Sequence, residues 1–209
     1  MTETPSEDLR IGVIGLQGAV SEHIEIINKA MRELDLKGKA FWLREASQLS
    51  EVNGIVVPGG ESTTIGRLMT TSGIFERVKE MGKNGMPILG TCAGLILLAK
   101  EGDEEVEKTG QPLLRLMDMR ITRNAFGRQR ESFEVNLDIS AFGERPFRCV
   151  FIRAPAIEEV WSNVEVLAEY EGKIVAAKQG NLIALAFHPE LTDDTRAHEY
   201  FLKLCESSK

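Results

Sequence analysis

The sequence predicts an α/β fold, a three-layer αβα sandwich in which helices cover both faces of a mainly parallel central sheet with some antiparallel strands. In the first half of the chain, short apolar runs alternate with segments that have the apolar spacing of helices. Because parallel strands need a long crossover, usually a helix, this alternation indicates a covered parallel sheet. In the second half, strand-like runs follow one another with turns between them, which favours antiparallel pairing.

The first half holds the elements that define the sheet. The apolar run IGVIGL at 11–16 predicts the first strand, and the helical spacing of apolar residues at 20–36 predicts the first helix. GIVV at 54–57 predicts a strand that Pro58-Gly59-Gly60 ends. The other expected elements of this half are a strand at 39–43, a helix at 63–82, a strand at 86–90 and a helix at 93–100.

The second half begins with the acidic, glycine-containing segment 101–112, which predicts a loop. The strand-like runs after it are 116–122, 132–138, 147–152, 164–169, 174–178 and 182–187, and a helix is expected at about 192–206. Because no Pro/Ser/Gly-rich linker divides the sequence, we expect one domain over 1–209, with the polar stretch 1–8 as a flexible lead-in.

The composition narrows the classes of function. A net charge of −7 disfavours non-specific nucleic-acid binding, and no apolar run approaches the roughly 18 residues of a membrane span. The three cysteines lie far apart, which predicts free thiols in a reducing compartment, and no residue spacing suggests a zinc site. We therefore expect a cytoplasmic protein with no metal, no cofactor, and no nucleic-acid or membrane partner.

Cys92 is the candidate nucleophile. It lies in Gly90-Thr91-Cys92-Ala93-Gly94, where a predicted strand turns sharply into a predicted helix between small residues. Such a turn exposes the side chain in a strained conformation, the following helix N-terminus favours a thiolate, and the Ala93 N–H can stabilise an oxyanion. The local pattern also fits an ordinary buried cysteine. Cys149 and Cys205 have no such turn, and we expect both to be structural.

His188 and Glu190 are the candidate base and its orienting group. His188 directly follows the apolar run that ends at Phe187, so it is expected at the carboxyl end of a buried strand, where ligands approach open parallel sheets. Glu190, two residues on, can accept a hydrogen bond from one ring nitrogen and leave the other for Cys92. Taken singly, each also fits a solvated residue. His23 and His198 lie on predicted helices, where solvated or partly packed positions are the default, and neither is assigned a catalytic role.

Gly59-Gly60 is the candidate second half of an oxyanion site. Two glycines directly after a strand can expose backbone N–H groups, so a donor at Gly60 could complement Ala93. Glu61 could hold the ammonium of an amino-acid substrate. The loop lacks the lysine of a Walker motif, which argues against phosphate binding, although a Pro-Gly-Gly sequence can also be a simple turn.

Together these residues resemble the class I, or triad, glutamine amidotransferases, whose glutaminase domains carry a G-x-C-x-G elbow, a Gly-rich loop and a late H-x-E. More narrowly, the chain resembles the glutaminase subunits of pyridoxal 5′-phosphate synthase. The segments that carry this resemblance are GLQGAVSEH (15–23), PGGESTTIGRL (58–68), GTCAGLILLAK (90–100), RNAFGRQRESFE (123–134), FIRAP (151–155), VAAKQGN (175–181) and FHPELTDD (187–194). They span nearly the whole chain.

The resemblance implies a class I amidotransferase fold and a catalytic triad of Cys92, His188 and Glu190. It implies glutamine-binding positions at Gly59, Gly60, Glu61, Arg123, Ile152 and Arg153. It also implies a (β/α)₈-barrel synthase subunit as partner in a large hetero-oligomer, with Gln17 and the first helix close to it. The assembled enzyme would make pyridoxal 5′-phosphate, that is vitamin B6, from ribose 5-phosphate, glyceraldehyde 3-phosphate and ammonia that this chain releases from glutamine.

Two alternatives remain at this point. The glutaminase subunit of imidazole glycerol phosphate synthase would share the elbow and the H-x-E, but RNAFGRQRESFE argues against it. A non-catalytic binding or redox-sensing protein on the same fold would not need the complete set of Cys92, His188 and Glu190.

Overall fold

The computed structural model describes residues 8–127 and 131–208. The expected lead-in 1–8 lies outside the described residues except for Asp8, and so do residues 128–130 of the segment RNAFGRQRESFE. Within the described part, no helix is both long enough and apolar enough to cross a membrane.

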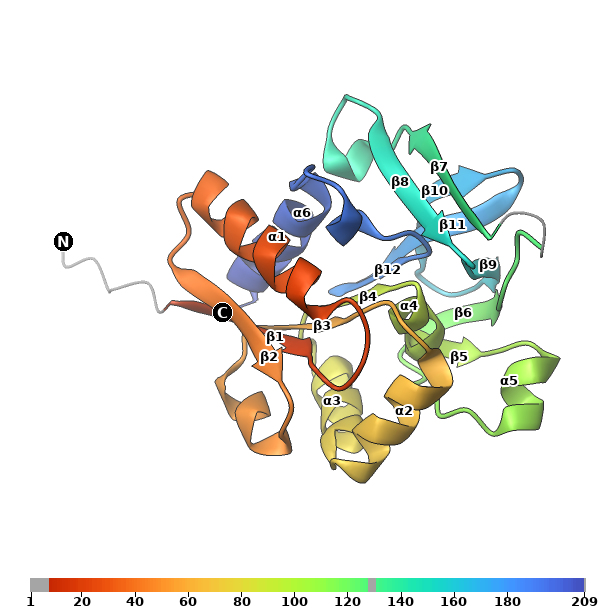
Figure 1. Ribbon diagram of the computed structural model, residues 1–209, viewed down its shortest axis with the longest axis horizontal. Helices are drawn as coiled ribbons and strands as arrows, with labels where there is room; N and C mark the ends of the chain where they lie inside the picture. Colours follow the sequence, from red (N-terminus) through yellow and green to blue (C-terminus); the bar gives the residue numbers. More distant parts are fainter. Residues whose placement is uncertain (1–7, 128–130, 209) are drawn as a thin grey trace.

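A ten-stranded sheet runs through the molecule, and its first part is parallel (Figure 1). The parallel strands lie in the order β2 (Gly38–Leu43), β1 (Leu9–Ile14), β3 (Gly54–Val57), β4 (Ile88–Thr91) and β12 (Leu182–Leu185). All residues of β3, β4 and β12 are buried, which explains why these strands read as continuous apolar runs without polar alternation.

The second part of the sheet is largely antiparallel. From β12 it continues through β11 (Lys173–Gln179), β9 (Ala156–Val160) and β6 (Met117–Thr122) to β5 (Ala99–Glu101), and β10 (Glu165–Tyr170) also pairs with β11. Only the last pair, β5 with β6, is parallel. A separate antiparallel pair, β7 (Ser132–Leu137) and β8 (Phe147–Ile152), lies beside it.

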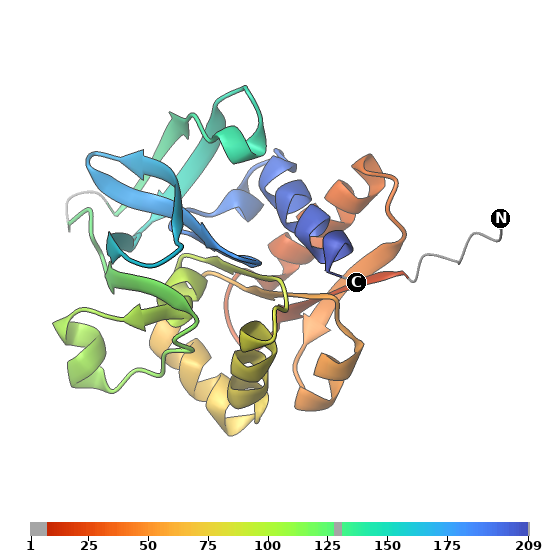
Figure 2. The same cartoon turned by 180° about the vertical axis from the view of Figure 1, so that it is seen from behind.

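Helices cover the two faces of the parallel strands. Helices α1 (Val20–Glu33) and α6 (Arg196–Ser207) lie side by side on one face, and α2 (Ser62–Thr71) and α3 (Ile74–Lys83) lie on the other (Figures 1 and 2). Helix α4 (Ala93–Leu98) packs against α2 and the sheet. Short 3₁₀ turns occur at Ala46–Glu51, Ser140–Phe142 and Pro189–Leu191. The predicted three-layer αβα architecture is therefore confirmed.

Four details of the sequence prediction were wrong. The single helix expected at 63–82 is two helices, because the chain turns at Ser72-Gly73 and Gly73 has a φ of 73°. The loop expected at 101–112 contains a helix, α5 (Glu104–Thr109), whose first N–H groups are capped by the Asp103 carboxylate. Strand β9 was not expected, and the helix expected at 93–100 ends at Leu98, where the chain enters β5.

Candidate active site

Cys92 lies at the turn between β4 and α4. Its backbone has φ 48° and ψ −99°, a conformation that non-glycine residues rarely adopt and that costs on the order of 1–3 kcal/mol. The turn is held by a hydrogen bond of 2.8 Å from the Cys92 N–H to the Leu185 carbonyl of the neighbouring strand. The strained elbow predicted from the sequence is therefore present.

The glycines on either side of Cys92 are required by close packing. A Cβ atom on Gly94 would lie 2.0 Å from the Val57 carbonyl oxygen, and one on Gly90 would lie 2.6 Å from the Gly94 backbone. Any side chain at these two positions would push α4 away from the sheet. The elbow sequence G-x-C-x-G therefore reflects the tight approach of helix to strand.

The strand register brings the histidine to the cysteine. β4 and β12 are parallel neighbours with Thr91 opposite Leu185, so the residues that follow the two strands emerge at the same edge of the sheet. The His188 backbone N–H is fixed by a bond of 2.8 Å to the Val150 carbonyl of β8. Both Cys92 and His188 line one pocket.

Glu190 holds the imidazole of His188. The distance from His188 Nδ1 to Glu190 Oε1 is 2.7 Å, and both side chains are buried. A carboxylate is an acceptor, so Nδ1 carries the proton of this bond, and Nε2 is left to exchange a proton with Cys92. This is the arrangement of nucleophile, base and orienting carboxylate.

The electrostatics of this pair favour charge on both partners. Burial alone would lower the pKa of His188, but hydrogen bonds with Cys92 and Glu190 and the negative charge of Glu190 raise it to about 10. Burial alone would raise the pKa of Glu190, but the neighbouring His23 and His188 rings lower it to about 2. Glu190 is thus ionised at neutral pH, and His188 readily holds a proton.

The Gly59-Gly60 loop is fastened to the loop between β1 and α1. The Gly59 carbonyl accepts a bond of 3.1 Å from the Ala19 N–H, and the Glu61 N–H donates to Gln17 Oε1 at 2.9 Å. Gly59 also lies against the His188 ring, because a Cβ atom there would be 2.4 Å from His188 Cε1. Gly60 and Ala93, the two expected oxyanion donors, both line the pocket beside Cys92.

The pocket has a volume of about 280 Å³, suited to a small polar molecule. It is lined by Gln17, Gly60, Glu61, Ser62, Cys92, Ala93, Ile96, Arg123, Asn124, Ile152, Arg153 and His188. Every substrate-binding position expected from the sequence is in this set except Gly59, which lies behind His188. Ser62, Ile96 and Asn124 were not expected, although the first and last of these adjoin expected residues.

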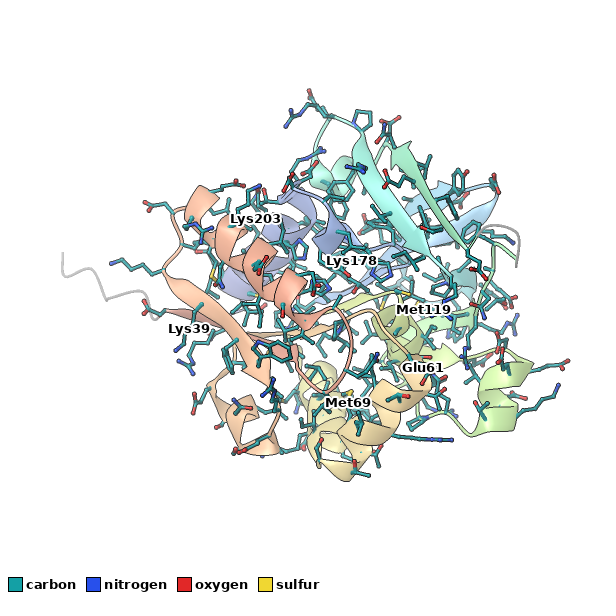
Figure 3. The ribbon with its side chains drawn as sticks, in the orientation of Figure 1. Lys39, Glu61, Met69, Met119, Lys178 and Lys203 are labelled. Carbon is teal, nitrogen blue, oxygen red and sulfur yellow. The ribbon has the colours of Figure 1, made fainter. Side chains whose placement is uncertain are left out.

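Glu61 and Arg123 stand close together at this pocket. The Glu61 carboxylate accepts hydrogen bonds from the N–H groups of Thr63 and Thr64 and so caps α2, which begins beside it (Figure 3). Arg123 Nη2 lies 3.9 Å from Glu61 Oε1, and Arg123 Nη1 donates to Gln111 Oε1 at 3.3 Å. One cationic and one anionic side chain thus face the space beside Cys92, as recognition of a zwitterion requires.

The expectation for His23 and His198 was wrong about their surroundings. Both rings are fully buried and lie behind the triad, with His23 Nδ1 3.1 Å from His198 Nε2. A helix position alone does not show which side faces the sheet when the neighbouring residues are mixed, so sequence reasoning missed this cluster. Cys149 and Cys205 are buried outside the pocket and neither forms a disulfide. Burial raises the pKa of Cys149 to about 12.

In the part of the chain that the structure describes, no group of three or more histidine, cysteine, aspartate or glutamate side chains is arranged to hold a metal ion.

Comparison with known proteins agrees with this geometry. Residues 13–207 match the model of the SNO glutamine amidotransferase family. The chain is 57% identical to the pyridoxal 5′-phosphate synthase subunit PdxT of Thermococcus onnurineus over 196 residues, which covers 93% of this chain and 98% of the relative. It is 55% identical over 194 residues to PdxT of Methanosarcina mazei, with 93% and 97% covered.

A solved structure has the same fold. The crystal structure of a glutamine amidotransferase superimposes with a TM-score of 0.83 at 42% sequence identity, over 93% of this chain and 98% of the other.

Proposed function

The chain belongs to the SNO glutamine amidotransferase family, and from this premise we propose that it is the glutaminase subunit of a pyridoxal 5′-phosphate synthase. It hydrolyses L-glutamine to L-glutamate and ammonia through a cysteine thioester. Two PdxT relatives of more than half identical sequence support this function. The observation that carries the chemistry is the pairing of His188 with Glu190 at 2.7 Å, in the pocket where Cys92 sits on a strained turn.

In the first step, the Cys92 thiolate attacks the carboxamide carbon of glutamine. The carbonyl oxygen becomes an oxyanion, which the N–H groups of Ala93 and Gly60 stabilise. When the C–N bond breaks, the protonated His188 gives its proton to the departing nitrogen, so that ammonia and a Cys92 thioester result.

In the second step, water replaces ammonia as the nucleophile. Neutral His188 takes one proton from the water as it attacks the thioester carbonyl, and the C–S bond breaks to give glutamate and the Cys92 thiolate. Glu190 keeps His188 oriented and stabilises its protonated form in both steps. The triad therefore returns to its starting state.

Recognition of glutamine would use residues around the pocket. Arg123 and Arg153 suit the α-carboxylate and Glu61 the α-ammonium, while Ile152 and the Gly59-Gly60 loop bound the side chain. Glu61 would serve the substrate while it caps α2, because a carboxylate has several acceptor positions.

The ammonia would pass to a synthase subunit that makes pyridoxal 5′-phosphate from ribose 5-phosphate and glyceraldehyde 3-phosphate. We propose that this partner is a (β/α)₈ barrel in a large hetero-oligomer, and that it contacts the region of Gln17 and α1. Gln17 also accepts a hydrogen bond from the Glu61 N–H, so contact with the partner at Gln17 would change the direction in which the neighbouring Gly60 N–H points. That none of the three cysteines forms a disulfide suits a cytoplasmic setting for the reaction.

The test measures glutamate release from L-glutamine, with the synthase subunit present, for wild type, Cys92→Ala and Cys149→Ala. Cys149 is a matched control, since it is also a buried free cysteine but lies outside the pocket. We expect Cys92→Ala to lose activity by at least about 10³-fold, as loss of a nucleophile does, and Cys149→Ala to stay near wild type. Glutamate release by Cys92→Ala at the wild-type rate would refute the proposed function.

A further inference from the structure

The three histidines of the chain are all buried and are linked around Glu190: His188 lines the pocket, whereas His23 and His198 do not. His23 comes from α1, His198 from α6, and His188 from the chain after β12. His23 Nε2 lies 3.1 Å from Thr91 Oγ1 and 3.4 Å from Glu190 Oε2, and His23 Nδ1 lies 3.1 Å from His198 Nε2. His23 therefore stands between the residue before Cys92 and the carboxylate that holds His188.

The positions of the protons in this cluster follow from the charge of Glu190. A lone pair of His23 facing an ionised carboxylate would be repelled, so Nε2 carries the proton and points it toward Glu190 Oε2 and Thr91 Oγ1. His23 Nδ1 is then an acceptor, and His198 Nε2–H donates to it. His198 Nδ1 has no hydrogen-bond partner among the described residues. In this tautomer it carries no proton, so no buried N–H of His198 is left unpaired.

Burial keeps His23 neutral, which decides how it acts. Burial lowers the pKa of His23, and the charge of Glu190 only partly offsets this, so at neutral pH the ring is an N–H donor and not a cation. Burial lowers the pKa of His198 to about 3, so this ring is neutral as well. Glu190 Oε2 accepts no hydrogen bond within the described residues, and His23 Nε2, 3.4 Å away, is a polar group that can restrain that side of the carboxylate electrostatically.

We propose that His23 is a positioning residue: it hydrogen-bonds Thr91 through Nε2, and the same Nε2–H, 3.4 Å from Glu190 Oε2, attracts the triad carboxylate and fixes it relative to the Cys92 turn, while His198 fixes the tautomer of His23. The inference rests on the proposed glutaminase function for its consequence in catalysis. His23 does not line the pocket, so it acts on the reaction through Glu190 and not through contact with glutamine.

The test compares His23→Leu with His23→Gln, because a glutamine side chain can still present an N–H to Glu190 whereas leucine presents none. Met31→Ala is the matched control for lost packing, since Met31 is a buried residue of the same helix two turns away. Two quantities are measured on the full chain: kcat and KM for glutamine with the synthase subunit present, and the rate of Cys92 alkylation by iodoacetamide without it. His23→Leu and His23→Gln are each also made in a Glu190→Gln background.

We expect His23→Leu to lower kcat by roughly tenfold to a hundredfold, the cost of leaving a buried polar group unpaired, with KM within about twofold of wild type. His23→Gln should recover most of that loss, and Met31→Ala should lower the melting temperature but not kcat. In the Glu190→Gln background, His23→Leu should change the alkylation rate by less than about twofold, because the group through which His23 acts has lost its charge.

Three results would overturn the proposal. The first is that His23→Leu lowers the alkylation rate equally in the wild-type and Glu190→Gln backgrounds, and the second is that its whole effect on turnover is a rise in KM. The third is that Met31→Ala lowers kcat as much as His23→Leu does. If His23→Leu does not fold, His198→Leu takes its place, because His23 then loses the neighbour that holds its proton on Nε2. If His198→Leu and His23→Gln both fold and both match wild type in alkylation rate, kcat and KM, the histidine cluster contributes packing alone, and the proposal is wrong. Failure of the wild type to release glutamate would refute the glutaminase function alone, since the alkylation cycle still measures the coupling of His23 to Glu190.

Discussion

Replacing Gly59 with alanine perturbs the triad through a single added carbon. Its Cβ would lie 2.4 Å from His188 Cε1 and 2.9 Å from His188 Nδ1, whereas ordinary contacts begin at about 3.4 Å. The ring or the loop must therefore move by about 1 Å, and a misplacement of that size at a catalytic group costs about 10²-fold in rate. The loop is restrained by the Ala19 N–H bond to the Gly59 carbonyl, so most of the movement should fall on His188.

The assay is glutamate release with the synthase subunit present, together with Cys92 alkylation by iodoacetamide on the chain alone. Gly82→Ala is the matched control, because Gly82 lies in α3 away from the pocket and its Cβ would meet Leu116 Cδ1 at 2.5 Å, a similarly close contact. We expect Gly82→Ala to retain kcat and Gly59→Ala to lose about a hundredfold.

The reasoning is refuted if Gly59→Ala folds with the wild-type melting temperature and turns over glutamine within about threefold of wild type, since a loss of about a hundredfold is the consequence of the displaced ring. An equal loss in Gly82→Ala would also refute it, because the effect would then come from crowding anywhere in the fold.

Three further predictions concern charge at the site. The pKa of Glu190 is lowered to about 2, so its contribution to stability is complete above the ordinary glutamate pKa and is lost as the pH falls from there toward 2. In acid unfolding, wild type should therefore be more stable than Glu190→Gln, and this difference should shrink over the same pH interval. A difference that stays constant with pH would contradict the prediction. The pKa of His188 is raised to about 10, so the stability that its charge contributes is complete below the ordinary histidine pKa and is lost as the pH rises through 10. Thermal unfolding of wild type and of His188→Gln, compared at pH values between the ordinary histidine pKa and 10, measures this loss. Arg123→Ala should raise KM for glutamine by roughly tenfold to a hundredfold with a smaller change in kcat, because a charge-assisted contact with the substrate is lost; an unchanged KM would remove Arg123 from substrate recognition.

The sequence predicted the parallel half of the sheet and the residues of the triad because these depend on local patterns. Strand β3 is entirely buried and therefore appears as an unbroken apolar run, and the elbow at Cys92 needs small neighbours that are visible in the sequence. His188 and Glu190 became candidates because they directly follow the apolar run 182–187, and the structure places their side chains 2.7 Å apart.

The remaining errors came from features that local patterns do not contain. The apolar spacing of α2 continues into α3 almost unchanged. The local signal for the break between the two helices was Gly73, which did not stand out among the other glycines of the sequence. Helix α5 has one buried residue, Val106, so it lacks an apolar face, and its cap at Asp103 was the available signal. The positions of His23 and His198 depend on how α1 and α6 pack against the carboxyl ends of β4 and β12, which is a property of the assembled fold.

The convergence of all three histidines makes the chain unusually easy to observe by spectroscopy. The sequence contains no histidine elsewhere, so every imidazole signal in a nuclear magnetic resonance spectrum of the protein comes from the ring of His188 or from the two rings linked to Glu190 behind it. Titration curves, tautomer-sensitive nitrogen shifts and ring-proton exchange would therefore report on the candidate site alone, without selective labelling. Binding of glutamine or of a second protein could be followed from the same three resonances.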